Sequence, residues 1–515
     1  MAVAPLIPGT TDQVRQDRIL LIWIGVGALV TLLRIDLIPW INDEPRLILR
    51  ALQANAAGHP APDGLPGSLG IRYFPVIIWF YQLLLKCSYD ILTIAFCKIL
   101  FCYTLFSAAI FSLRRFLRCR AIFLALLFVS PPLWFTHRIL WDNCFLVPLV
   151  PWVILAAAWF VTRPGWGRLL AWLIPAVLAI YIHPQVLFLQ LPSLVVMVLY
   201  RKRWFFASLR RFWAVSGLGT LLLLPFLVRL LNSHFTRGSS HRHAAPWFAG
   251  LTGWRMFCSR DFAAMLPDFP RVVVPDFPWL RWFVQPLHWL SIYFAAGLFG
   301  LGVIWLIREG VRLHRRRQLG CRQAFPVQFH RGTIMLWIAG GTVVLQSLFF
   351  MVTHVHDFSH YFNGTWIAYY LIMLSGFAML SERLWMGACS VYTAVTTCLL
   401  FAVMLRIACC GGAVSFQYGP VLGDQLRIAR QVARYRTGNY RWNGQTPASF
   451  NFSHALDTLV KLEWLRRQTP PTAQTPPLIF TVTFRTPRTP WDAWQTLSVQ
   501  SAVNTNKDRS APNRP

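Results

Sequence analysis

Acidic residues are scarce in this chain. Its 515 residues include 19 Asp and Glu against 49 Lys and Arg, and charged residues of both signs make up 13% of the sequence. Hydrophobic residues make up 56%, and the mean hydropathy is +0.47. These values lie outside the range of ordinary soluble domains. The few carboxylates therefore stand out as candidates for chemistry.

Three other features are missing. The eleven cysteines contain no C-x-x-C pattern and lie mostly inside apolar runs, so no disulfide framework is indicated. The sequence has no Gly-rich phosphate loop, and so no motif for a nucleotide-linked donor. No cleavable signal peptide is evident, because the apolar run 19–39 is long enough to span a membrane and lacks a following small-residue cleavage pattern.

Long apolar runs dominate the sequence instead. Continuous runs of about 20 residues suit membrane-spanning helices, whereas strands of a porin-like barrel alternate. We predict an all-α polytopic membrane protein with about eleven transmembrane helices. The expected spans are 19–39, 89–113, 121–136, 143–161, 169–182, 185–200, 212–231, 289–307, 333–352, 361–380 and 385–407.

The arginines indicate the orientation. With a cytoplasmic N-terminus, the cytoplasmic loops 114–120, 162–168, 201–211, 308–332 and 381–384 carry 4, 2, 5, 7 and 1 Lys or Arg. The short outer loops 137–142, 183–184 and 353–360 carry 1, 0 and 0. This alternation follows the positive-inside rule and places the C-terminus outside. It also explains the net charge of +30 without nucleic acid.

The expected organisation has three parts. A transmembrane catalytic region, 1–407, includes a first outer loop at 40–88 and a long outer loop at 232–288. The first outer loop contains an amphipathic stretch, 45–57, and an apolar run, 73–85, which is too short to span and suits an interfacial helix. A small extracytoplasmic domain, 408–500, has helix-like stretches near 424–435 and 454–467 and a strand-like stretch at 478–484. Residues 501–515 have the composition of a disordered tail.

The acidic pair Asp43-Glu44 comes just beyond the first predicted span. A carboxylate beside the low-dielectric membrane boundary can act as a general base toward a hydroxyl. The pair also suits a solvated loop or the start of a helix, because Asn42 or Asp43 precedes Pro45 and proline is favoured in the first helical turn. The residues leave both interpretations open.

Two further outer turns carry polar residues. Arg138 and Asp142 lie four apart, so on a helical turn they share a face, as a structural ion pair or as a phosphate-binding cation beside a second acidic residue. The segment His354-x-His356-Asp357-x-x-His360 suits phosphate or substrate contact or an interfacial polar belt, and zinc is less favoured because the spacing is not a closed signature. His183-Pro184 is interpreted as structural.

The order of these features resembles the GT-C superfamily of integral membrane glycosyltransferases, across roughly residues 15–400. The subgroup it most resembles includes protein O-mannosyltransferases and the lipid A aminoarabinose transferase. Those relatives often carry His-Pro-Pro before the interfacial helix, where this chain has Arg72-Tyr73-Phe74-Pro75, and the tail matches nothing in the family. The resemblance is carried by Asp43-Glu44, Arg138-x-x-x-Asp142, His183-Pro184 and His360-Tyr361-Phe362.

This resemblance implies an inverting glycosyltransferase. The implied donor is a polyprenyl-phosphate sugar, and the acceptor is an envelope glycan, a lipid or a protein on the outer face of a bacterial inner membrane. Asp43 would be the general base, with Glu44 beside it and Asp142 as a second acidic residue. Arg138, Arg72, His360 and Tyr361 would bind the donor phosphate. No cofactor is expected, and a divalent metal is not favoured.

Three other classes are weighed against this one. A transporter or flippase of lipid-linked saccharides predicts internal repeats and ionisable residues in the middle of spans. A membrane O-acyltransferase needs a histidine buried within a span, for which only His183 comes close. A non-catalytic scaffold leaves the polar outer turns without a purpose.

Overall fold

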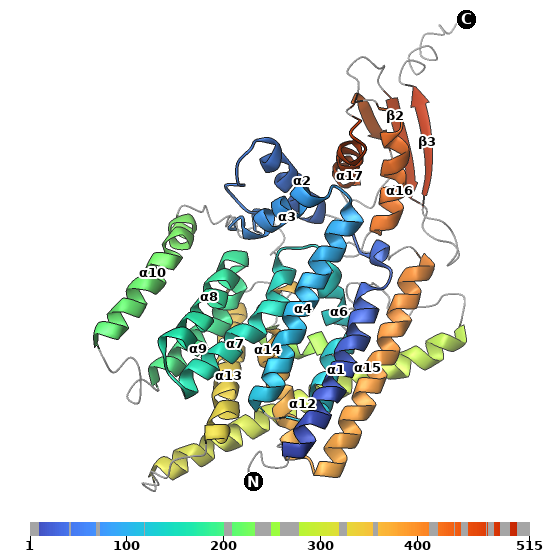
Figure 1. The fold of residues 1–515 in the computed structure, drawn as a ribbon. Coiled ribbons are helices and arrows are strands. Elements are labelled where there is room, and N and C mark those ends of the chain that lie inside the picture. The colour runs from blue at the N-terminus through green and yellow to red at the C-terminus, as the bar shows by residue number, and fades with distance from the viewer. Residues whose placement is uncertain are drawn as a thin grey trace, which may run out of the picture.

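The computed structural model describes residues 10–40, 43–67, 73–117, 119–199, 209–231, 249–257, 278–318, 327–353, 359–410, 421–436, 438–443, 452–469, 471, 478–484 and 495–501. These residues form a helical bundle with a small domain of helices and strands at one end (Figure 1). Helix α1 (Thr10–Leu32) begins at the opposite end of the bundle.

Five apolar segments in the described part of the chain are long enough to cross a membrane. Backbone groups in lipid must be satisfied within the segment, and a continuous helix does this. The multi-pass character predicted from the sequence is therefore supported. The segments are Ile91–Leu117, Asn143–Thr162, Gln285–Arg312, Gly332–Thr353 and Arg383–Leu405, which belong to α4 (Ile91–Leu117), α7 (Leu146–Thr162), α12 (Pro278–Gln318), α13 (Val327–Thr353) and α15 (Glu382–Cys410).

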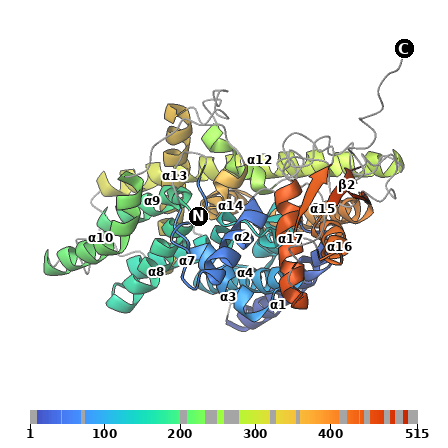
Figure 2. The same ribbon diagram turned by 90° about the horizontal axis from the view of Figure 1, so that it is seen from above.

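The other predicted spans coincide with α1 and with shorter helices, so the number eleven stays a prediction. These helices are α5 (Ile122–Val129), α6 (Pro131–Arg138), α8 (Trp166–Ile182), α9 (Leu187–Leu199), α10 (Leu209–Leu231) and α14 (Trp366–Gly376). Helix α7 lies at the centre of the bundle, because 89% of its apolar stretch is buried. The corresponding share in α12 is 33%. Figure 2 shows α12 running along one side of the bundle.

Two predicted boundaries were wrong. The expected span 121–136 is divided into α5 and α6 at Ser130, because Pro131 cannot donate a backbone hydrogen bond to continue the first helix. The expected span 289–307 lies inside α12, which continues to Gln318 through residues predicted to be a cytoplasmic loop. The rest of that loop, 319–326, lies outside the described residues.

The long outer loop predicted at 232–288 has a described inner part that packs into the bundle. The 3₁₀ segment η8 (Ala249–Phe257) packs against α12, α13 and α14. The hydroxyl of Tyr369 donates to the carbonyl of Gly250, and Met256 and Phe257 are buried. Residues 232–248 and 258–277 lie outside the described residues.

The first outer loop forms the two helices expected from its sequence. These are α2 (Asp43–Ala56) and α3 (Val76–Cys87), which pack against each other above the bundle (Figure 1). Helix α2 buries one face through Leu47, Ile48 and Ala51. Tyr81 of α3 fixes the second helix to the bundle by donating to the carbonyl of Leu140 at 2.7 Å.

The C-terminal domain combines two helices with a three-stranded sheet. Helices α16 (Leu422–Ala433) and α17 (Phe452–Arg467) and strand β2 (Leu478–Phe484) match the predicted stretches, whereas β1 (Tyr440–Asn443) and β3 (Gln495–Ser501) were not predicted. β2 is the central strand, parallel to β1 and antiparallel to β3. The label all-α therefore holds for the bundle and not for this domain. The predicted disordered tail beyond Ser501 lies outside the described residues.

Candidate active site

Asp43 and Glu44 begin α2, where the helix dipole favours a carboxylate. Their environments differ. The Asp43 side chain is 45% exposed and lies 3.6 Å from Arg46, whereas Glu44 is fully buried. Desolvation by the surrounding protein raises the pKa of Asp43, and the charge of Arg46 lowers it in part. Asp43 is therefore the member of the pair that a substrate can reach.

Asp142 follows α6 and caps the 3₁₀ turn η3 (Asn143–Phe145) that leads into α7. Its Oδ1 accepts from the backbone N–H of Asn143 at 2.7 Å. Burial, and then the charge of Asp43, raises the pKa of Asp142 to about 7. The structure thus brings together the two carboxylates that the sequence separates by about a hundred residues.

Tyr73 lies within the electrostatic reach of both carboxylates and was not chosen from the sequence as a site residue. Burial raises its pKa, and the charges of Asp142, Tyr361 and Asp43 raise it further. Its hydroxyl lies 2.8 Å from Nε2 of His183. The tyrosine therefore links the first outer loop to the turn between α8 and α9.

His183 holds the Tyr73 hydroxyl in one arrangement. Nδ1 of His183 accepts from the backbone N–H of Gln185 at 3.3 Å, so the ring proton is on Nε2. Burial, and then the charge of His360, lowers the pKa of His183 to about 3, which keeps the ring neutral. Nε2–H then donates to the Tyr73 oxygen. His183 was interpreted as structural from the sequence, and this contact adds a role in the site.

His360 and Tyr361 bring a fourth turn to the same place. They lie in η9 (Ser359–Phe362), with their ring centroids 4.3 Å apart. The rings of His360 and Trp141 are T-shaped to each other, with their centroids 6.0 Å apart. Trp141 precedes Asp142 in the sequence. Burial lowers the pKa of His360 to about 4, so it is neutral at neutral pH.

Arg138 has a supporting position. Its guanidinium donates to the carbonyls of Thr31 at 3.0 Å and of Leu33 and Arg34 at 2.5 Å, at the end of α1. It also stacks over the ring of Trp134 at 4.7 Å. These bonds satisfy the last carbonyls of the helix. The predicted phosphate role of Arg138 remains a prediction that this geometry does not favour.

Two predicted elements of the site lie outside the described residues. They are Arg72 and the segment 354–358, which includes His354, His356 and Asp357. In the part of the chain that the structure describes, no group of three or more His, Cys, Asp or Glu could hold a metal ion.

Comparisons with protein-family models, with curated proteins and with solved structures find no match for this chain. The interpretation of the site therefore depends on its own chemistry. We call Asp43, Tyr73, Asp142, His183 and His360 the outer cluster. It combines two carboxylates of different environment, a tyrosine hydroxyl and two neutral imidazoles, which suits proton transfer and hydrogen bonding to a developing anion.

Proposed function

We propose that this chain is a membrane glycosyltransferase that moves a sugar from a polyprenyl-phosphate donor to an acceptor hydroxyl. The observation that carries the proposal is the convergence of Asp43 and Asp142 in the outer cluster, at one end of a bundle with membrane-length helices. A lipid-linked donor suits this position, because its tail can stay in the bilayer while its phosphate and sugar reach the cluster.

In the proposed reaction Asp43 takes the proton of the acceptor hydroxyl. The acceptor oxygen attacks the anomeric carbon from the face opposite the phosphate and forms the new C–O bond. The bond from that carbon to the phosphate oxygen breaks, and its electron pair leaves with the polyprenyl phosphate. The configuration at the anomeric carbon is thereby inverted.

The environments of the two carboxylates support this division of roles. Asp43 is accessible and lies beside Arg46, which favours the ionised form that a base needs. The raised pKa of Asp142 keeps a large share of it protonated near neutral pH, so it can donate to the leaving phosphate. Paired groups with separated pKa values are the usual pattern of acid and base in an active site. The Tyr73 hydroxyl supplies a second donor.

The transporter alternative predicts ionisable groups deep in the bundle. Lys98 in α4 is such a group and is fully buried. However, its ammonium donates to the carbonyls of His137 at 3.0 Å and Ile139 at 2.5 Å, which satisfies the end of α6. This structural role leaves the enzyme as the better-supported function. We place it in a bacterial inner membrane, with an envelope glycan, lipid or protein as acceptor.

The test is the variant Asp43→Asn, which keeps the size of the side chain and removes the proton acceptor. A general base contributes roughly 10²–10⁴-fold to the rate, so transfer should fall by at least about 100-fold while the detergent melting temperature is unchanged. The measurement is mass spectrometry of envelope glycans from cells that carry each variant or lack the gene.

Asp63→Asn is the matched control, because Asp63 is a carboxylate of the same outer segment. It should leave the glycan profile as in wild type. If deletion of the gene changes no glycan, or if Asp43→Asn retains full transfer, the proposed function is wrong.

A further inference from the structure

The C-terminal domain holds the three residues that lead toward α2. Pro39 and Val421 form an antiparallel β-bridge, and the N–H of Leu422 donates to the carbonyl of Ile38 at 2.8 Å. The extended segment Ile38–Trp40 therefore acts as a short strand paired with the start of α16. Two chain segments about 380 residues apart are joined at this point.

Trp40 is the centre of this attachment and is fully buried. Its indole N–H donates to the carbonyl of Ala455 in α17 at 3.0 Å. Its own carbonyl accepts from the side-chain amide of Gln425 in α16 at 2.7 Å. Both helices of the domain thus hold one residue, which lies three positions before Asp43. We call these two bonds and the bridge at Pro39 the clamp.

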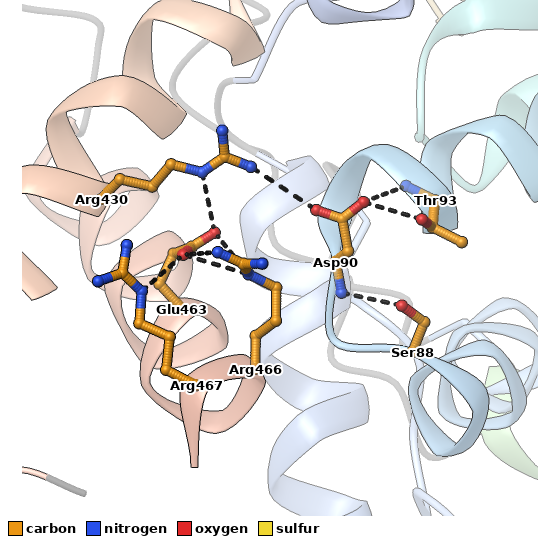
Figure 3. A network of polar contacts seen from close by, with 7 residues as sticks. All are labelled: Ser88, Asp90, Thr93, Arg430, Glu463, Arg466 and Arg467. Atoms are coloured by element: carbon orange, nitrogen blue, oxygen red, sulfur yellow. Dashed lines mark hydrogen bonds and ion pairs between the residues drawn. The ribbon is translucent and has the colours of Figure 1, made fainter. Parts of the chain in front are cut away.

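A second attachment lies at the far end of the same outer segment (Figure 3). Arg430 of α16 reaches Asp90 at 3.9 Å and Glu463 of α17 at 3.2 Å. Asp90 in turn accepts from Thr93 at the start of α4. The Glu463 side chain is 3% exposed, accepts from Arg466 and forms an ion pair with Arg467.

The two attachments bracket the segment that carries α2 and α3, and they differ in strength. The ion pair between Arg430 and Asp90 is long and partly exposed, and such pairs contribute little. The clamp is buried, so its bonds have no competing water. Helix α17 also packs directly against α2. The buried clamp and this packing are therefore the contacts by which the domain can set the position of the first turn of α2.

We propose that the C-terminal domain positions Asp43 for catalysis through the clamp, with Gln425 and Trp40 as positioning residues. This inference rests on the proposed function, in which Asp43 is the base. Neither residue touches the reacting atoms. Their effect is to fix the direction in which the chain enters α2, and a misplacement of about 1 Å at a catalytic group can cost on the order of 100-fold in rate.

The test compares Gln425→Met and Trp40→Phe in the full-length chain. Methionine keeps the length of glutamine and removes the donor, and phenylalanine removes only the indole N–H and part of the ring. Hydrogen exchange of the peptide that covers α2 is measured first, since it does not require activity. We expect it to quicken about 10-fold, as for the loss of one hydrogen bond, while exchange in α4 and α7 stays unchanged.

Steady-state transfer is measured next. A displaced base should lower kcat about 10- to 100-fold and leave the KM for the donor within about 2-fold. Arg430→Gln is the matched control, because it loosens the second attachment on the same helix without touching the clamp. It should change neither the exchange of α2 nor kcat.

The hydrogen-exchange and kinetic results can each overturn the proposed role of the clamp. Unchanged exchange in α2 with both clamp variants overturns the proposal, as does an equal effect of Arg430→Gln. If Gln425→Met does not fold, the milder Trp40→Phe supplies the same comparison. If the wild-type chain shows no transfer, the proposed function fails, while the exchange result still shows whether the domain fixes the start of α2.

Discussion

The two carboxylates of the outer cluster have different chemistry because of what surrounds them. Asp142 is half-buried and caps η3, and desolvation by the surrounding protein, followed by the charge of Asp43, raises its pKa to about 7. Asp43 is accessible and has Arg46 as a counter-charge. The charge of Asp43 therefore makes ionisation of Asp142 less favourable.

This pairing predicts the pH dependence of transfer. The raised pKa means that Asp142 is protonated below about pH 7 and loses its proton above it. If the proton is donated to the leaving phosphate, kcat/KM should fall by about tenfold per pH unit well above pH 7. Asp142→Asn cannot titrate, so it should lower the rate and remove this alkaline limb. A variant that keeps the wild-type limb would assign it to another group.

The Tyr73 hydroxyl gives a second prediction. Tyr73→Phe removes the donor and leaves Nε2–H of His183 without its acceptor. Loss of one donor to a developing anion costs on the order of 10²-fold, so kcat should fall by about that factor. Tyr103→Phe is the control, because it removes a tyrosine hydrogen bond to the carbonyl of Ile24 without touching the cluster. It should reduce only the melting temperature. Equal kinetic loss in both variants would mean that the Tyr73 effect is structural.

Part of the cluster could be predicted from the sequence. Asp43, Asp142 and His360 stood out because polar residues are scarce at the outer ends of apolar runs. Tyr73 was missed and His183 was taken as structural, because their roles arise from a contact between residues 110 positions apart. The feature of the sequence that could have indicated this contact was a histidine at a predicted outer turn, His183.

Arg138 shows how little the sequence says about the surroundings of a single cation. It was the only Lys or Arg in the short outer turns, and this isolation favoured a phosphate role. In the structure it donates to the carbonyl of Thr31 in α1 and to those of Leu33 and Arg34 just after the helix, and carbonyls at a helix end need such donors. The sequence around Arg138 does not indicate which helix end will lie close to it in the folded protein.

At the scale of elements, close helix packing depends on glycine. Helices α12 and α14 cross where a Cβ at Gly302 would collide with the carbonyl oxygen of Ile372, and one at Gly376 with that of Leu298. Small residues at such crossings let helix backbones approach in membrane proteins. The contact is therefore set by the backbone and cannot adapt by a change of side-chain rotamer.

Gly376→Ala should accordingly destabilise the bundle by about 1–3 kcal/mol, the usual cost of overpacking. Gly297→Ala on α12 is the matched control, because a Cβ there meets nothing within 4 Å. It should be neutral or stabilise by about 0.5–1 kcal/mol, as alanine does in a helix. Detergent melting curves measure both. Equal melting temperatures would contradict the crossing.

The positions of the helices followed from the apolar runs, but their interruptions did not. Pro131 marks the break between α5 and α6, yet proline also occurs inside α7, α8 and α9 without ending them. Neighbouring helices can satisfy the freed carbonyls. The insertion of η8 was hidden for a similar reason, since its burial depends on Gly250 and Gly253 meeting residues of α13 and α14.

At the scale of the whole molecule, the two ends of the bundle carry different groups. Asp17 near the start of α1 pairs with Arg114 and Arg115 at the end of α4. Helices α2 and α3 and the C-terminal domain lie at the opposite end (Figure 1). The contacts between that domain and the segment Ile38–Trp40 could not be predicted, because they join residues up to 415 positions apart.

The predicted orientation of these two ends across the membrane can be tested. The cytoplasmic loops should be the arginine-rich ones, so a reporter enzyme active only outside the cytoplasm should be inactive when fused after Arg120 and active when fused after Pro515. The fusion test does not require catalytic activity, because the expected orientation depends only on loop charge. The reverse pattern would place Asp43 and Asp142 in the cytoplasm. The acceptor would then have to be cytoplasmic, and the envelope glycan, lipid or protein outside the membrane could not be the substrate.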